Sequence, residues 1–275
     1  MTLKEAMFKQ SITELHWAAQ VVASVGPTYL PAQKSNHHLA LNWDARGWIV
    51  SPEIKPNRSF EVALDIAHLQ LHFLGHADAP NRQPSSTFAL RGHTLAAAYT
   101  WLEETLAAYL QRDFEHVKRL SELPWELPAH PLNRGALFSY QESSFKHCEE
   151  AFVAAHAQLS ALHQRYHANA HPLHVWPQEL TLSTLLHEID REIEVGFALS
   201  TSKVPEPHYF LKSTQVPVTK PNLAHGHWQG SLIVLPLQTL ASLAPAQQAQ
   251  HVATFLAENT HYLWTLPHQS DDVFM

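Results

Sequence analysis

Residues 60–73 read Phe-Glu-Val-Ala-Leu-Asp-Ile-Ala-His-Leu-Gln-Leu-His-Phe, and this stretch decides the fold class of the chain. On both sides of Ala67-His68, apolar side chains occupy every second position. That spacing is the period of a β-strand that buries one face. Two such runs joined by a short turn predict neighbouring antiparallel strands of a meander. Asp65 and His68 flank the turn, where an aspartate commonly bonds its own backbone.

The residues before and after this stretch extend the meander and add a helix at each end. Further strands are expected at 37–43 and 48–50, because apolar and polar residues alternate there. A helix is expected to begin at the capping box Ser11-Ile-Thr-Glu14 and to end at Gly26-Pro27. A second helix is expected at 94–111, where apolar residues recur at helical spacing.

The same order of helix, strands and helix occurs again in the second part of the chain. A long apolar stripe from Phe145 to Tyr166 predicts a helix, and Pro245 is well placed in the first turn of another. Five strands are expected between these helices, at 173–176, 179–185, 191–199, 208–211 and 229–235.

We therefore predict an α+β fold of two helix–antiparallel meander–helix halves, pseudo-duplicated and packed as one unit. The first half is residues 1–111 and the second is residues 142–275. Residues 112–141 form the connection, with one strand near Phe114. Because the two halves share little sequence identity, a single α+β domain whose element order only looks periodic is the alternative.

Composition narrows the class of protein. Of the 275 residues, 45% are hydrophobic and 16% are charged, which supports a sizeable core. The net charge of −7, without a lysine or arginine cluster, argues against a nucleic-acid partner, which needs a basic face. No signal peptide and no apolar run near the roughly 20 residues that span a bilayer is visible, so we expect a cytoplasmic protein that makes no membrane contact. Cys148, the single cysteine, shares a helix stripe with Phe145 and Phe152 and is expected to be buried.

Two histidines are the main candidates for a functional site. His37, after Asn36, opens the leading strand of the first half, and His174 opens the leading strand of the second. Strand ends that converge across related sheets often line a cleft. We therefore expect both imidazoles in one crevice, with Asn36 and Trp176 beside the ligand.

A carboxylate can complete this site. Glu192 and Glu194 alternate with apolar residues on a predicted strand, so both face the same way. His37, His174 and Glu192 can together bind a divalent metal with open positions or act as an acid–base group, and Glu194 can contact a ligand. The alternative is a pair of hydrogen-bonded structural histidines that fix the strand ends, because the spacing is no metal signature.

Several short motifs resemble those of an uncharacterised bacterial domain-of-unknown-function family, which reads Asn-His-Trp-Trp-His-Val, then a Gly-Leu-x-Thr-Ser-Pro turn and a Phe-Glu strand, and later His-Phe-Phe-Trp and His-Glu-Val. The matching residues span most of the chain: Asn36-His37, Gly47, Ser51-Pro52, Phe60-Glu61, Asp65, His68, His174-Val175-Trp176, Glu192 and Leu235-Pro236. The chain departs from these motifs at other positions, namely His38, Leu39, Ala40, Pro177 and Thr181. The resemblance supports the architecture and implies no reaction.

The sequence thus predicts a protein of unknown function that binds a small molecule or a divalent metal in a cleft between the halves, with hydrolase-like chemistry as one form of that activity. The alternative is a non-enzymatic protein–protein interaction or self-association module, for example a homo-oligomer. The pattern does not decide whether the protein is an enzyme.

Overall fold

A computed structural model describes residues 3–55, 59–75, 83–110, 118–127, 129–188, 191–217 and 219–266. The chain packs into two units, one made of residues 1–152 and 174–180 and the other of residues 153–173 and 181–275. The α+β class is confirmed, since helices accompany two antiparallel sheets. The duplication stays a hypothesis. Packing assigns the described part of the predicted connection to the first unit and divides the long helix α4 (Glu142–Arg165) between the two. The predicted strand near Phe114 lies outside the described residues.

A five-stranded antiparallel sheet forms the centre of the first unit, with its strands in sequence order. The stretch that decides the fold class supplies its middle, where β3 pairs with β4 around the predicted turn. The strands are β1 (Asn42–Asp44), β2 (Trp48–Val50), β3 (Phe60–Asp65), β4 (Gln70–Gly75) and β5 (Ser86–Ala89).

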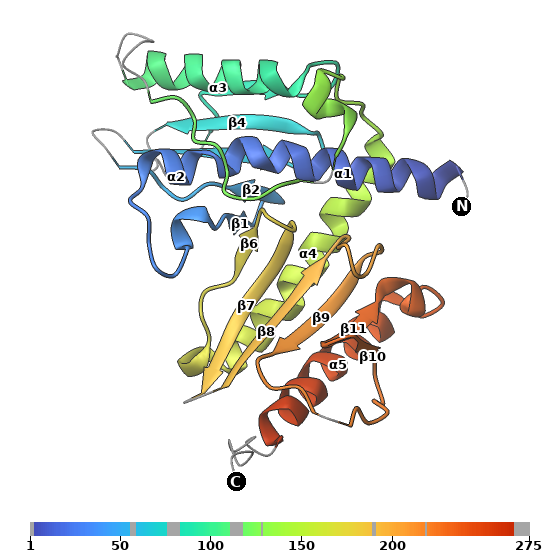
Figure 1. Ribbon diagram of the computed structural model, residues 1–275. Helices are drawn as coiled ribbons and strands as arrows, with labels where there is room; N and C mark the ends of the chain where they lie inside the picture. Colours follow the sequence, from blue (N-terminus) through green and yellow to red (C-terminus); the bar gives the residue numbers. More distant parts are fainter. Residues whose placement is uncertain are drawn as a thin grey trace. The chain divides into compact units, whose positions relative to one another are not determined.

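Helices cover one face of this sheet (Figure 1). Helix α1 (Leu3–Ala23) contacts β2 and β3, and α3 (Leu95–Leu110) contacts β4 and β5. From α3, the ring of Tyr109 lies 6.2 Å from that of Phe60 and 5.0 Å from that of Phe73, centroid to centroid. Successive strand residues point to opposite faces, so Asp65 and His72 face away from these helices.

The described part of the first unit also contains four short elements. They are α2 (Val25–Tyr29), η1 (His37–Leu39), η3 (Pro131–Arg134) and β6 (His174–Trp176). Side chains of α1 bind the residue that follows β6, because Gln20 Nε2 donates to the carbonyl oxygen of Pro177 at 2.9 Å. His16 Nε2 lies 2.9 Å from the same oxygen.

Three of the predicted element boundaries are wrong. Gly26-Pro27 does not end the first helix, because α1 ends at Ala23 and both residues lie inside α2. Ser11 is no helix cap, because α1 already begins at Leu3 and Ser11 is buried within it. Glu14 instead accepts hydrogen bonds from the backbone N–H and the hydroxyl of Ser139, at 3.0 and 2.7 Å. His37 does not open a strand: it lies in η1, after Asn36 in the left-handed region with a φ of 58°, and β1 begins only at Asn42.

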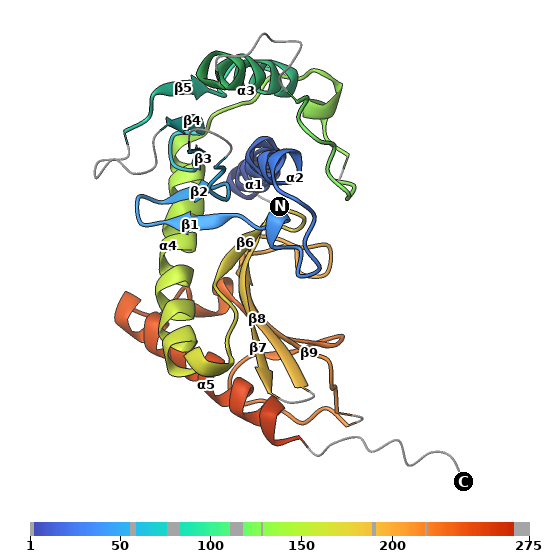
Figure 2. The ribbon, with the colours of Figure 1, turned by 90° about the vertical axis from the view of Figure 1, so that its left-hand side faces the viewer.

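The second unit contains a further antiparallel sheet and the last helix. Its strands follow the order β10-β11-β9-β8-β7, and α5 packs on β8, β9 and β11 (Figure 2). The predicted strand at 229–235 is a hairpin, since β10 and β11 pair around Gly230. The elements are η4 (His167–Asn169), β7 (Thr181–Glu188), β8 (Arg191–Ala198), β9 (His208–Ser213), β10 (His227–Gln229), β11 (Leu232–Pro236), η5 (Leu237–Leu240) and α5 (Pro245–Thr265).

Two expectations from composition can be compared with the structure. Cys148 is fully buried, as predicted, and burial raises the pKa of its thiol to about 12, which keeps it protonated and unreactive. Within the described ranges, none of the helices combines the length and the apolar character that crossing a bilayer requires.

Candidate functional site

The register of the first sheet brings an aspartate, a histidine and a threonine together. His72 of β4 pairs with Thr87 of β5 on one side and with Ala63 of β3 on the other. Asp65 lies two residues beyond Ala63, so its side chain is on the same face as that of His72. The small Ala63 leaves room above β3 for the two side chains to meet.

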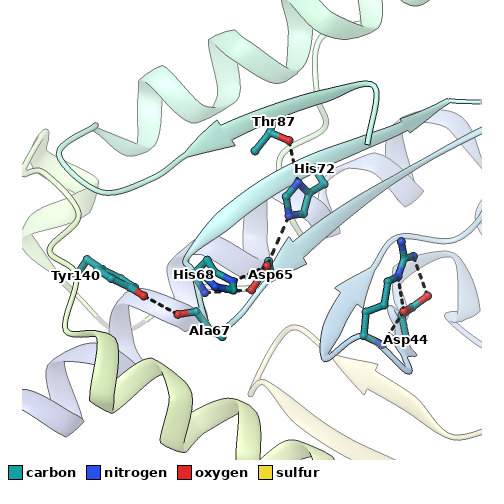
Figure 3. A network of polar contacts seen from close by, with 8 residues as sticks. Asp44, Asp65, Ala67, His68, His72, Thr87 and Tyr140 are labelled. Atoms are coloured by element: carbon teal, nitrogen blue, oxygen red, sulfur yellow. Dashed lines mark hydrogen bonds and ion pairs between the residues drawn. The ribbon is translucent and has the colours of Figure 1, made fainter. Parts of the chain in front are cut away.

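The resulting polar network runs through three strands and one turn (Figure 3). Thr87 Oγ1 lies 3.0 Å from His72 Nδ1, within hydrogen-bond distance. On the other side of the ring, His72 Nε2 lies 3.7 Å from Asp65 Oδ2, an electrostatic contact longer than a hydrogen bond. His68 contacts the same carboxylate: its Nδ1 lies 2.8 Å from Oδ2, and its backbone N–H donates to Oδ1 at 3.0 Å.

Asp65 is ionised in this setting. Burial by itself raises the pKa of a carboxyl group. The interactions with the ring of His72 and with the backbone and ring of His68 outweigh burial, so the pKa of Asp65 lies below its ordinary value. The carboxylate thus places a fixed negative charge beside both imidazoles.

An aromatic side chain packs on the network. The indole of Trp48 stacks on the ring of His72, with centroids 4.4 Å apart and planes 27° from parallel. The guanidinium carbon of Arg46 lies 3.9 Å from the centre of the same indole, a cation–π contact. Arg46 is held by Asp44 through a nitrogen–oxygen pair at 2.7 Å. Gly47, with a φ of 81°, completes the hairpin turn that carries these residues.

The side chains at the two ends of the network are exposed to solvent, whereas those in its middle are buried. Asp65 and His72 are buried, whereas 61% of the His68 side chain is exposed and Thr87 is also exposed. Tyr140 fixes the turn next to His68, because its hydroxyl donates to the carbonyl of Ala67 at 2.9 Å (Figure 3). A ligand can therefore reach Thr87 from solvent while the imidazole behind it stays shielded.

The predicted histidine pair is also brought together. The rings of His37 and His174 lie 5.3 Å apart, centroid to centroid, within the first unit. A two-way backbone bridge between Leu41 and Val175, at 2.9 and 2.8 Å, holds their segments side by side. The ring of Trp176 stands edge-on at 6.0 Å from that of His174. Asn36 precedes His37 at the start of η1.

The carboxylates of the predicted site belong to the second unit. Glu192 is exposed on β8, and Glu194 is partly buried there. Glu194 Oε1 accepts from the hydroxyl of Ser183 at 3.1 Å, and its Oε2 lies 3.7 Å from Lys212 Nζ. Throughout the part of the chain that the structure describes, no group of three or more His, Cys, Asp or Glu side chains is arranged to hold a metal ion. The metal set of His37, His174 and Glu192 stays a prediction.

Sequence reasoning missed the role of Asp65. The expected bond from the aspartate to its own turn is present, but it is only part of the network. The sequence could have predicted this contact. With the turn placed at Ala67-His68, the alternation of side chains along each strand puts Asp65 and His72 on the same face of adjacent strands. Thr87 carried no such signal, because the strand that contains it was not predicted.

Comparison with known proteins gives a family and no activity. No curated protein and no solved structure matches the chain. A family model described as a family of unknown function (DUF5996) matches residues 2–194, which include the polar network and the His37–His174 pair. The predicted resemblance to an uncharacterised family is thereby confirmed. By this match over more than half of its length, the chain belongs to the family of unknown function DUF5996.

Proposed function

We propose that the first unit carries out acid–base chemistry on a small ester-like molecule, with His72 as the base and Thr87 as the group it activates. The observation that supports this proposal best is the 3.0 Å contact between Thr87 Oγ1 and His72 Nδ1, with the Asp65 carboxylate on the far side of the ring. A hydroxyl, an imidazole and a carboxylate in series are the arrangement that hydrolytic triads use on unrelated folds.

The proposed reaction is the hydrolysis of an ester in two steps, and it needs no cofactor. Thr87 Oγ1 attacks the acyl carbon of the ester while its proton passes to His72 Nδ1. That proton then goes to the departing alcohol, which leaves the acyl group on Thr87. Water attacks the acyl-threonine and gives a proton to Nδ1; the proton returns to the threonine oxygen as the acid leaves. Asp65 stabilises the imidazolium that forms during each of these two steps, the acylation of Thr87 and the hydrolysis of the acyl-threonine.

Hydrolysis of p-nitrophenyl acetate tests the proposal. We expect the wild type to release p-nitrophenol, and His72→Gln and Thr87→Val to lower kcat/KM by about 100-fold or more, because each removes the base or the nucleophile. Thr87→Val keeps the shape of the side chain, and circular dichroism checks that both variants are folded.

The matched control is His68→Gln, which removes the other imidazole on Asp65. Because His68 touches neither Thr87 nor the proposed path of the proton, we expect this variant to stay within a few-fold of the wild type. Equal rates for all the variants, or no hydrolysis by the wild type, would overturn the assignment.

We propose as a second candidate that His37 and His174 bind a divalent metal or a small polar ligand beside Trp176. The contact between the imidazole rings, 5.3 Å apart, supports it. Two imidazoles leave open coordination positions for water or a ligand.

A cytoplasmic location and self-association of the protein stay predictions. Among the described residues, the large hydrophobic side chains that are exposed are those of Leu137 and Val153.

Zinc titration of the untagged protein tests the second candidate. We expect calorimetry to show one zinc site fewer in the double variant His37→Gln/His174→Gln than in the wild type. Each single variant should bind zinc at this site at least about tenfold more weakly, because a ligand is lost. His93→Gln, which removes an exposed imidazole elsewhere in the first unit, is the control. If the double variant binds zinc like His93→Gln, the pair is structural.

A further inference from the structure

A cavity lies in the first unit, away from the polar network. It has a volume of about 340 Å³ and is bordered by α1, α3 and the segment 118–127. Its walls are mainly aromatic and aliphatic, with Trp17 from α1, Tyr99 from α3, and Leu123 and Trp125 from the segment. This size is at the lower end of the roughly 300–1,000 Å³ that small-molecule sites occupy.

One wall of the cavity contains an unsatisfied hydrogen-bond donor. Trp17 is 9% exposed, and its indole N–H is buried without a hydrogen-bond partner in the described part of the chain. A buried donor that has lost its water and gained no acceptor is unfavourable, and such groups are rare in folded proteins. A bound molecule that offers an acceptor oxygen would remove that penalty.

A second donor lines the same space. Tyr99 is partly buried, and burial raises the pKa of its phenol to about 12. Its hydroxyl is therefore neutral and keeps its proton at physiological pH, so it can donate to a ligand. It cannot become an anion that would repel an acceptor.

Hydrogen bonds hold the segment 118–127, which borders the cavity, in place. Trp125 Nε1 donates to Gln20 Oε1 at 2.9 Å, and Gln20 itself is buried against the chain at Pro177. The backbone N–H of Ser121 donates to Thr28 Oγ1 at 2.8 Å. These bonds tie the segment to α1 and α2, so the cavity exists before a ligand arrives and little ordering is needed on binding.

The charge of the lining restricts the ligand. Among the described residues that border the cavity, Glu122 is the charged one, and none is a lysine or an arginine. The carboxylate of Glu122 disfavours an anion, whereas a neutral aromatic molecule gains from contact with the rings.

We infer that this cavity binds a neutral, planar, largely apolar small molecule whose carbonyl or similar oxygen accepts a hydrogen bond from the indole N–H of Trp17. The site is separate from the polar network of Asp65, His72 and Thr87, and its occupancy does not depend on the chemistry proposed there.

Prodan, a neutral naphthalene ketone whose emission reports on its surroundings, is a suitable probe. We expect the wild type to bind it with a shift of its emission to shorter wavelength. Trp17→Phe keeps an aromatic ring but has no N–H, so it should bind prodan about five- to tenfold more weakly, the usual effect of one lost hydrogen bond. Leu123→Trp fills the space and should abolish binding.

Trp228→Phe is the matched control, because Trp228 also has a buried indole N–H without a partner in the described residues but lies in the second unit. It should bind prodan like the wild type. Circular dichroism and thermal melting check that each variant is folded. If Trp17→Phe unfolds, Leu123→Trp alone decides the question. Failure of the wild type to bind prodan, or unchanged binding by folded Trp17→Phe and Leu123→Trp, would overturn the inference.

Discussion

Replacing Arg191 by methionine is expected to lower the free energy of unfolding by about 3 kcal/mol or more, because it leaves buried carbonyl groups without donors. Arg191 is 4% exposed, and its guanidinium donates to the last turn of α5. Nη1 bonds the carbonyls of Leu263, at 3.1 Å, and Trp264, and Nη2 bonds that of Leu266 at 2.7 Å. These are carbonyls that a helix leaves unpaired at its C-terminus, where the helix dipole also favours a positive charge.

Urea unfolding, followed by circular dichroism, measures the effect. Arg191→Lys keeps the charge but cannot present the same fork of donors. We therefore expect its free energy of unfolding to lie between those of the wild type and Arg191→Met. The control is Arg165→Met, which removes an exposed arginine of the same unit and should change stability by less than about 0.5 kcal/mol. A loss for Arg191→Met no larger than for this control would show that water replaces the guanidinium.

The long helices could be predicted from the sequence because their signal is local. The apolar stripes of α3, α4 and α5 recur at helical spacing and give the right elements to within a few residues. The start of α1 was missed for an equally physical reason. A serine followed three residues later by a glutamate is a capping box only when the serine is at a helix end. Here Glu14 bonds Ser139, far along the chain, and no local pattern contains that partner.

The two histidine rings lie close together although one premise of that prediction is wrong. The alternation around His37 predicts a strand, whereas the segment forms a 3₁₀ turn. The rings nevertheless meet, because Leu41 bridges Val175 a few residues later. Arg191 is the opposite case: its partners lie more than 70 residues away, and its strand pattern shows no sign of them.

The polar network could not be derived from residue spacing alone. Asp65 and His72 are neighbours only because β3 and β4 pair in one register, and a slip by one residue would place them on opposite faces. The cavity beside Trp17 depends even more on tertiary structure, since its walls come from two helices and a segment without regular structure.

Asp65→Asn is expected to lower the free energy of unfolding at neutral pH by about 1–2 kcal/mol, because a neutral amide replaces the ionised partner of His68 and His72. The pKa of Asp65 in the folded protein lies below its ordinary value. The unfolded chain therefore binds a proton first as the pH falls through about 4. The stabilisation is present above that pH and is lost below it, as the folded carboxylate is protonated too.

The pH profile of unfolding thus separates this charge from a general packing defect. The wild type and Asp65→Asn should differ in stability above about pH 4 and converge as the pH falls below it, whereas a packing defect would lower stability equally at every pH. Glu53→Gln, which breaks the partly exposed ion pair with Lys55, is the control and should change stability by at most about 1 kcal/mol.

The same variant distinguishes structural from chemical use of the network. If Asp65 stabilises an imidazolium at His72, Asp65→Asn should also slow p-nitrophenyl acetate hydrolysis by a factor comparable to His72→Gln, measured at a temperature where both are folded. A loss of stability with an unchanged rate would make Asp65 a structural anchor of the β3–β4 turn and would remove it from the proposed mechanism. Because Asp65 touches both His68 and His72 but only His72 touches Thr87, the rates of Asp65→Asn and His68→Gln together decide which contact matters.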